Sequence, residues 1–435
     1  MNERFIIKGG RPLKGEVEVR GSKNVASKLM IASLLTEKPC VIENVPLSQE
    51  MEITRELCES IGSRVEFGEN SLLKIETPHI KTSRIAGLSR RNRIPILALA
   101  PLLHRKGVAE VPVLGGCPIG HRPINFHIEA LSQMGAKIER RENSYYAEAP
   151  ELHGAEIEFP YPSVGATENI ILAASLARGR TFIKNAAMEP EILNLIQMLQ
   201  QMGAKISFDI KSRAIEIEGV KNLQGVRVRV IPDRNEIASF ASAALATDGE
   251  IFIKDVQEDY LTSFLQKINE IGANFKSESG GIKFWGRRPY RAVSITTAPH
   301  PNFMTDWQQP FAVLLTQASG ESIIHETVYE DRFGYVKDLN KMGAQVEVSK
   351  DCPVEDPCRF LGLGFGHTAK ISGFADLRGA EIAMTDIRAG MAHIIAALVA
   401  EGESVISGVE HVDRGYEKID ERLRKLGADI ERVEI

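Results

Sequence analysis

The sequence predicts an α/β protein of two lobes, because helices and strands alternate within one repeat along the chain. A short phrase, an apolar helix end followed by Gly, a small residue and a strand, occurs six times. Glycine suits this position because the residue after a helix end often adopts a left-handed conformation. The glycines are Gly62, Gly135, Gly203, Gly272, Gly343 and Gly427, at intervals of 73, 68, 69, 71 and 84 residues.

A second phrase lies between copies of the first: an Ala- and Leu-rich helix end, a turn and a strand, as in ASLARGRTFIKNA and ALVAEGESVISGV. Each repeat of about 70 residues therefore holds two helices and several strands, and six repeats fill nearly the whole chain. The first helix of each repeat is apolar on nearly all sides, as in ILALAPLL. We expect these helices to be buried and surrounded by strands.

Six such repeats are too many for one core, so the expected arrangement is two lobes of three repeats. The first lobe is predicted to span 22–231 and the second 1–21 together with 232–435. The N-terminal segment FIIKGG…EVEVRG is expected to pair with strands of the second lobe. The excess length of the last interval indicates an insertion at about 350–367.

The composition excludes several classes of protein. The chain has 435 residues, of which 43% are hydrophobic and 26% charged, unlike a disordered, collagen-like or disulfide-stapled protein. Its 53 basic and 58 acidic residues leave a net charge of −5, which argues against a general nucleic-acid binder. No apolar run reaches the roughly 18 residues of a membrane span. The N-terminus lacks a signal-peptide pattern, and the five scattered cysteines are expected to be reduced, so a cytoplasmic location is predicted.

Equivalent positions at the starts of the six apolar helices carry polar or charged residues. They are Lys23, Arg93, Ser163, Arg234, Asp306 and Asp386, at intervals of 70, 70, 71, 72 and 80 residues. A helix start offers unpaired N–H groups and a partial positive charge, which suit anions. If all six starts face one cleft between the lobes, that cleft would bind a small, multiply charged anion. Helix capping is the alternative role for the Ser and Asp residues.

The glycine-rich loop 115–123 contains Cys117 and Arg122. Its glycines predict a mobile lid, and the neighbouring cation would favour the thiolate form of Cys117. A buried structural cysteine is the alternative. His127 is interpreted as a possible core histidine. Cys352 and Cys358 are widely spaced and have no matching second pair, so no metal site is expected.

A resemblance to a known family extends over essentially the whole chain. It rests on a series of motifs in this order: RGSKN, LGGCPIGHRP, SVGAT, AAMEPE, IPDR, TAPHPNFMTD, ETVYEDRF, TDIRAG and HVDRGYE. On these motifs the sequence resembles the enolpyruvyl transferases. The resemblance implies two inside-out α/β barrel lobes that close around hinges near Ser22 and Ile231. It also implies transfer of enolpyruvyl from phosphoenolpyruvate to the 3′-hydroxyl of UDP-N-acetylglucosamine, through a tetrahedral ketal and with loss of phosphate. This would be a cytoplasmic step of peptidoglycan synthesis, without cofactor, metal or obligate protein partner.

The resemblance also implies roles for single residues. Cys117 would be the general acid, form a reversible covalent adduct and react with fosfomycin, while Asp306 would be the base and Lys23 a third catalytic residue. The residues expected to bind phosphoenolpyruvate are Lys23, Arg122, Arg332, Asp386, Arg388 and Arg414. Those expected to bind the acceptor nucleotide are Asn24, Arg93, Arg122, Pro123, Asn125, Ser163, Val164, Gly165, Asp306 and Val328.

The departures from the family pattern fall on the acceptor side. They are Asn92, Asn125, Tyr161 and Met188, where the family usually has other residues. A changed acceptor site can change specificity strongly. An enolpyruvyl transferase with another acceptor, such as UMP or a modified UDP-sugar, therefore remains an alternative. A non-catalytic paralogue that binds a nucleotide sugar is a third hypothesis.

Overall fold

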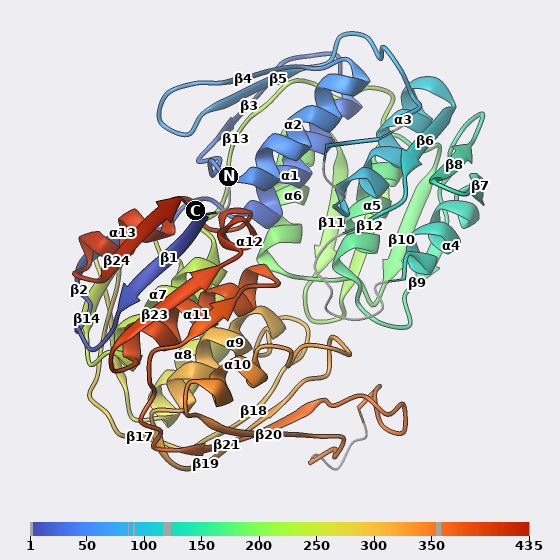
Figure 1. Cartoon of the computed structure of the whole chain (residues 1–435). Helices are drawn as coiled ribbons and strands as arrows, with labels where there is room; N and C mark the ends of the chain where they lie inside the picture. Colours follow the sequence, from blue (N-terminus) through green and yellow to red (C-terminus); the bar gives the residue numbers. More distant parts are fainter. Residues whose placement is uncertain (1–2, 86, 90–91, 116–122, 354–357, 435) are drawn as a thin grey trace. The chain divides into compact units, whose positions relative to one another are not determined.

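The computed structural model describes residues 3–85, 87–89, 92–115, 123–353 and 358–434 (Figure 1). The chain divides into two compact units. Unit 2 contains the described residues from Gly21 to Ile231, and unit 1 contains those before Gly21 and after Ile231. In the described ranges, no helix is long and apolar enough to cross a membrane.

Unit 2 carries three sheets in its described part, with strand orders β13-β3-β5-β4, β6-β8-β7 and β11-β12-β10-β9. Its helices are α1 (Lys23–Ala32), α2 (Gln49–Ile61), α3 (Leu99–Lys106), α4 (Asn125–Gln133), α5 (Val164–Ala174) and α6 (Pro190–Gln201), with the short 3₁₀ helices η1 (Ser33–Leu35) and η2 (Ile94–Ala98). Its strands are β3 (Cys40–Glu43), β4 (Arg64–Phe67), β5 (Leu73–Glu76), β6 (Val108–Pro112), β7 (Lys137–Arg140), β8 (Ser144–Glu148), β9 (Glu156–Glu158), β10 (Arg180–Lys184), β11 (Lys205–Asp209), β12 (Ala214–Glu218) and β13 (Arg227–Arg229).

Unit 1 likewise carries three sheets, with strand orders β22-β23-β1-β24, β15-β16-β14-β2 and β17-β19-β21-β20, and β18 pairs with β19. Its helices are α7 (Arg234–Ala246), α8 (Thr262–Glu270), α9 (Gln308–Leu315), α10 (Val336–Lys341), α11 (Ile387–Val399), α12 (Val409–Asp413) and α13 (Ile419–Lys425), with η3 (Glu258–Leu261) and η4 (Thr305–Trp307). Its strands are β1 (Glu3–Lys8), β2 (Lys14–Glu18), β14 (Glu250–Lys254), β15 (Asn274–Glu278), β16 (Gly281–Trp285), β17 (Tyr290–Arg291), β18 (Ser294–Thr296), β19 (Ala318–His325), β20 (Gln345–Ser349), β21 (Thr368–Gly373), β22 (Glu381–Ala383), β23 (Glu403–Ser407) and β24 (Asp429–Glu434).

The apolar helices form the interior of each unit. Every residue of α7 is buried, and α11 is buried along all but its last residue. In unit 1, helices α7, α9 and α11 pack against one another (Figure 1). In unit 2, helices α1, α3 and α5 each pack against η2, and α3 also packs against α5. Strands such as β10 alternate exposed and buried residues, because one face lies on these helices and the other meets solvent. The predicted arrangement of strands around buried helices is confirmed.

The glycines of the repeated phrase have the predicted backbone conformation. Their φ angles are all positive, between 82° and 125°, at the junction from helix to strand. A residue with a Cβ atom would be strained there, which explains why glycine recurs at this point of each repeat.

The N-terminal strands belong to unit 1. Strand β1 lies between β23 and β24, and β2 pairs with β14. The two chain segments that join the units are paired by backbone hydrogen bonds. The Ser22 N–H donates to the Ile231 carbonyl at 2.8 Å, and the Asp233 N–H donates to the Arg20 carbonyl at 2.8 Å.

Candidate active site

Asp306 lies between two buried arginines in unit 1. It belongs to η4, directly before the apolar helix α9. Its carboxylate accepts a hydrogen bond from Arg332 Nη2 and another, at 3.3 Å, from Arg388 Nε. The two arginine side chains are 3% and 5% exposed, whereas that of Asp306 is 22% exposed. The structure therefore places two fixed cations beside a carboxylate that solvent reaches.

Arg388 is held by the first turn of α11. The Asp386 carboxylate caps this helix, accepting from the backbone N–H groups of Arg388 at 2.8 Å and Ala389 at 3.1 Å. The guanidinium lies over the ring of Tyr416, 5.2 Å from its centroid. Burial opposes the charged form, but Tyr416 and the Asp306 and Asp233 carboxylates outweigh it and raise the pKa of Arg388. Arg388 is therefore a permanent cation.

Arg332 is positioned by Glu326, a residue that the sequence analysis did not single out. Glu326 is fully buried at the end of β19. Its carboxylate accepts from the Thr305 hydroxyl at 2.8 Å and from the backbone N–H groups of Val328 at 2.8 Å and Tyr329 at 3.1 Å. These bonds tie the turn 326–332 to the residue before Asp306. The position of Glu326 inside the motif ETVYEDRF was the sequence signal that could have identified it.

Capping explains several of the polar residues at helix starts, as the alternative interpretation proposed. Asp386 caps α11, Asp233 caps α7 by accepting from the Asn235 N–H at 2.8 Å, and Ser163 caps α5 by accepting from the Ala166 N–H at 3.4 Å. Asp306 differs, because its described hydrogen bonds go to arginine side chains rather than to its own helix.

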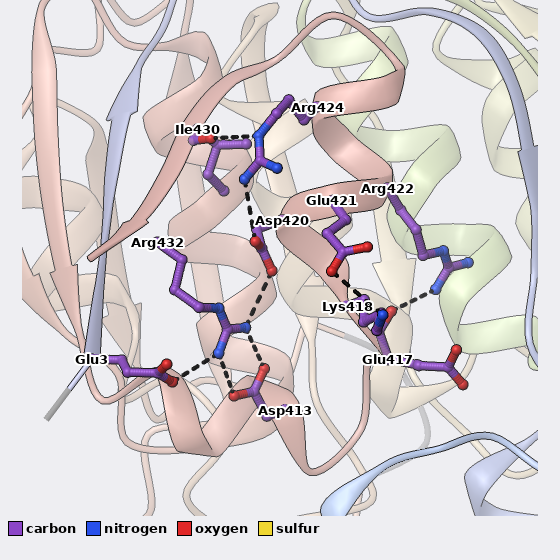
Figure 2. A network of polar contacts seen from close by, with 10 residues as sticks. All are labelled: Glu3, Asp413, Glu417, Lys418, Asp420, Glu421, Arg422, Arg424, Ile430 and Arg432. Carbon is purple, nitrogen blue, oxygen red and sulfur yellow. Dashed lines mark hydrogen bonds and ion pairs between the residues drawn. The ribbon is translucent and has the colours of Figure 1, made fainter. Parts of the chain in front are cut away.

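Arg414 follows α12, and the residue before it is anchored by a network of ion pairs (Figure 2). The Asp413 carboxylate accepts from Arg432 at 2.9 and 2.8 Å. Arg432 also donates to Glu3 at 2.9 Å and to Asp420 at 3.2 Å. The network joins the turn that carries Arg414 to β1, β24 and α13, and so restrains it.

Lys23, predicted for catalysis and phosphoenolpyruvate, and the predicted acceptor residues of unit 2 lie at element starts. Lys23 and Asn24 are the first residues of α1, and Val164 and Gly165 are the first residues of α5. Arg93 immediately precedes η2. Lys23, Asn24 and Arg93 are partly exposed, while Pro123 and Asn125 are exposed at the start of α4.

His127 is a core histidine, as interpreted from the sequence. It is 4% exposed, and its Nδ1 lies 3.2 Å from the amide nitrogen of Asn169. Burial lowers the pKa of His127 to about 3, and the positive charge of Arg93 contributes. A Cβ on Gly165 would lie 3.3 Å from the imidazole, so the small residue lets α5 start close to this ring.

Two of the unusual acceptor-side residues have structural roles. Asn92 is buried, donates to Glu50 Oε1 at 3.1 Å and accepts from the Ile94 N–H at 3.2 Å, which fixes the start of η2. Met188 is 1% exposed and belongs to the core of unit 2. Asn125, in contrast, is exposed and donates to Glu129 at 3.4 Å.

A buried carboxylate of unit 2 makes stability depend on pH. Burial raises the pKa of Glu168 to about 7; Lys28 opposes this shift, and Glu191 and Glu189 add to it. The unfolded chain would lose this proton near pH 4.5, so the native state binds more protons between these values. Stability contributed by protonated Glu168 is complete below about pH 4.5 and is lost as the pH rises to about 7.

We expect the Glu168→Gln substitution to remove the loss of stability between about pH 4.5 and 7, because glutamine has no proton to lose. Above pH 7 the variant should be more stable than the parent by up to about 3 kcal/mol. Thermal unfolding followed from pH 4.5 to 8 measures the difference, with exposed Glu139→Gln as the control. A pH profile identical to that of the parent would contradict the assignment.

The sequence profile of the EPSP synthase (3-phosphoshikimate 1-carboxyvinyltransferase) family matches residues 7–423. The chain belongs to this family. A UDP-N-acetylglucosamine 1-carboxyvinyltransferase of Protochlamydia amoebophila is 47% identical over 98% of this chain and 94% of its own length. One from Chlamydia abortus is 46% identical over 97% of this chain and 96% of its own. The protein is therefore an enolpyruvyl transferase.

The solved structures confirm the fold class of this enolpyruvyl transferase. The enolpyruvyl transferase NikO from Streptomyces tendae matches with a TM-score of 0.87 at 22% identity, over 99% of both chains. An EPSP synthase from Acinetobacter baumannii matches with a TM-score of 0.71 at 18% identity, over the whole of both chains.

The structure brings together part of the predicted site of the enolpyruvyl transferase. Asp306, Arg332 and Arg388 are in direct contact, and the charge of Asp386 also acts on Arg332. Cys117 and Arg122 lie outside the described residues. The meeting of all six helix starts in one cleft stays a prediction.

Proposed function

We propose that this enolpyruvyl transferase moves the enolpyruvyl group of phosphoenolpyruvate to the 3′-hydroxyl of UDP-N-acetylglucosamine and releases phosphate, as a step of peptidoglycan synthesis. The observation that carries the proposal is the pairing of Asp306 with the buried Arg332 and Arg388. The names of the relatives from Protochlamydia amoebophila and Chlamydia abortus support the choice of acceptor. We also propose a cytoplasmic location.

The two arginines suit an anionic substrate. Phosphoenolpyruvate carries a phosphate and a carboxylate, and a guanidinium binds either group through two parallel hydrogen bonds. Because Arg332 and Arg388 are buried and held by neighbouring groups, little side-chain entropy is lost when they bind a ligand. We assign them to phosphoenolpyruvate together with Lys23, Arg122, Asp386 and Arg414. An anion that takes over these hydrogen bonds would leave the Asp306 carboxylate able to accept a proton.

In the addition step, Asp306 takes the proton of the sugar 3′-hydroxyl. At the same time, the oxygen of that hydroxyl forms a bond to C2 of phosphoenolpyruvate. The Cys117 thiol gives a proton to C3, so the double bond becomes a methyl group and a tetrahedral ketal results. In the elimination step, a base removes one methyl proton, the bond between C2 and the phosphate oxygen breaks, and phosphate leaves. The product regains the carbon–carbon double bond.

For the acceptor, we assign Asn24 to the sugar, Arg93 to the nucleotide, and Ser163, Val164 and Gly165 to the diphosphate. The start of α5 offers backbone N–H groups that suit a diphosphate. Pro123, Asn125 and Val328 would complete this side. Asn125 is the one unusual residue among them, and its exposure leaves room for an acceptor other than the UDP-sugar.

Release of phosphate from phosphoenolpyruvate tests the proposal. We expect release that requires UDP-N-acetylglucosamine and is absent with UMP. Equal or faster release with UMP would favour the alternative acceptor. Binding of UDP-N-acetylglucosamine without phosphate release, across all acceptors tried, would indicate the non-catalytic paralogue. The Asp306→Asn variant serves as the control for background hydrolysis.

A further inference from the structure

Two histidines and two cysteines meet at one end of the sheet that contains β19, β20 and β21. His325 is the last residue of β19, Cys352 follows β20, and His367 immediately precedes β21. Cys358 lies between the last two. One ligand atom from each of the four residues lies within 4.8 Å of the others. The histidines are buried and the cysteines partly buried.

Strand register explains why sequence spacing did not reveal this cluster. In the sequence, Cys352 and Cys358 have no matching second pair of cysteines, and on that ground no metal site was expected. In the structure, β19 and β20 both flank β21, and both His325 and Ser349 stand opposite Thr368. This register brings both histidines close to the cysteines. The second pair of metal ligands is therefore His325 and His367, and not two further cysteines.

The His367 imidazole is prepared to act as a ligand. Its Nδ1 lies 2.8 Å from the Phe365 carbonyl oxygen, which can only accept, so Nδ1 carries the proton. Its Nε2 therefore keeps a free lone pair. That nitrogen is buried and has no hydrogen-bond partner among the residues that the structure describes. A buried, unsatisfied ring nitrogen costs free energy unless a further group binds it.

The hydrogen bonds of His325 fix the same tautomer. The Thr368 hydroxyl donates to the Asp351 carbonyl at 2.5 Å. It therefore accepts the bond from His325 Nδ1, which is 2.9 Å away. His325 Nε2 keeps its lone pair and lies 3.5 Å from Cys352 Sγ. Hydrogen bonds from Nδ1 to carbonyl or hydroxyl oxygens are the outer-shell contacts that orient metal-binding histidines.

The distance between two of the four candidate ligand atoms fits a tetrahedral ion. Bonds of about 2.3 Å to sulfur and about 2.0 Å to nitrogen would place neighbouring ligand atoms roughly 3.3–3.8 Å apart. The separation of 3.5 Å between His325 Nε2 and Cys352 Sγ lies in this range. The Cys358 N–H donates to Cys352 Sγ at 3.4 Å, which orients this sulfur within the cluster.

We propose that His325, Cys352, Cys358 and His367 bind a Zn²⁺ ion. Two sulfurs and two imidazole nitrogens in a tetrahedron are typical of zinc. Because the protein supplies all four ligands, no position is left for a reacting water, and the ion has a structural role.

The ion would fasten the insertion 350–367 to the sheet next to the candidate active site. The neighbour of His325 is Glu326, whose N–H donates to the His367 carbonyl at 2.8 Å and whose carboxylate holds the turn 326–332. Arg359 of the insertion also pairs with Glu330 of this turn at 3.6 Å. Loss of zinc should therefore lower thermal stability.

Metal analysis of the full-length protein, purified under reducing conditions, tests the proposal. We expect about one zinc per chain by mass spectrometry, and far less in Cys352→Ser and His367→Gln. The matched controls Cys58→Ser and His153→Gln, which change a buried cysteine and a histidine in unit 2, should keep the metal. Replacement of zinc by Co²⁺ in the parent protein should give the visible absorption of tetrahedral cobalt and a thiolate charge-transfer band.

The cobalt spectrum needs no variant, so it is decisive even if a substitution impairs folding. Parent protein that contains no metal after growth with zinc, and gives no tetrahedral cobalt spectrum, would overturn the proposal. A disulfide between Cys352 and Cys358 in that protein, or retention of zinc by both ligand variants, would overturn it equally. None of these results depends on which acceptor the enzyme uses.

Discussion

Asp306→Asn is expected to lower kcat by about 10²–10⁴-fold, the range for loss of a general base. An amide cannot take the proton of the sugar hydroxyl. The substitution also removes the negative charge that Arg332 and Arg388 share. Because both arginines would then be open to an anionic ligand, the KM for phosphoenolpyruvate should stay the same or fall. A fall in kcat without a rise in KM identifies a group that acts in the transition state.

Asp248→Asn is the matched control for this experiment. Asp248 also lies in unit 1 and also pairs with an arginine, accepting from Arg288 Nε at 3.0 Å and Nη2 at 2.8 Å. Its loss should reduce stability and leave turnover near that of the parent. Steady-state phosphate release gives kcat and KM for both variants. An Asp306→Asn enzyme with nearly normal kcat, or one impaired only through KM, would remove Asp306 from the role of base.

Cys117→Ser is expected to slow turnover by about 10²–10⁴-fold and to abolish covalent labelling by fosfomycin. A thiol with a pKa near 8.5 can exchange its proton at neutral pH, whereas a serine hydroxyl is a far weaker acid and nucleophile. Cys117 lies outside the described residues, so this prediction rests on the glycine-rich loop 115–123, on Arg122 and on the family resemblance. Intact-protein mass spectrometry counts the adducts.

Cys58→Ser serves as the control for labelling. Cys58 is fully buried, and burial together with the charge of Glu59 raises the pKa of its thiol, so it should not react. The parent and Cys58→Ser should each gain one fosfomycin adduct, and Cys117→Ser none. Retention of a single adduct by Cys117→Ser would show that another thiol is the target.

Short-range features of this protein were predictable from the sequence. The recurrence of glycine at helix ends predicted six left-handed residues, and all six have positive φ. The Ala-rich segments predicted buried helices, and α7 and α11 form the core. Capping was the alternative role considered for Ser163 and Asp386, and both residues cap their helices. The glycine conformation and the caps depend on sterics or hydrogen bonding within a few residues, and helix burial follows from the apolar composition of a short segment, so neighbouring residues carry the information.

Contacts between distant residues required the folded chain. Asp306 meets Arg388, 82 residues further along, because α9 and α11 pack side by side. It meets Arg332, 26 residues further along, because the turn after β19 is bonded back to Thr305 through Glu326. Glu326 acquires its role from Thr305 on another element. The cluster of His325, Cys352, Cys358 and His367 forms because β21 pairs with both β19 and β20 in one register. Packing and strand register decide which charges and lone pairs face one another. Local composition and residue spacing do not specify either of them.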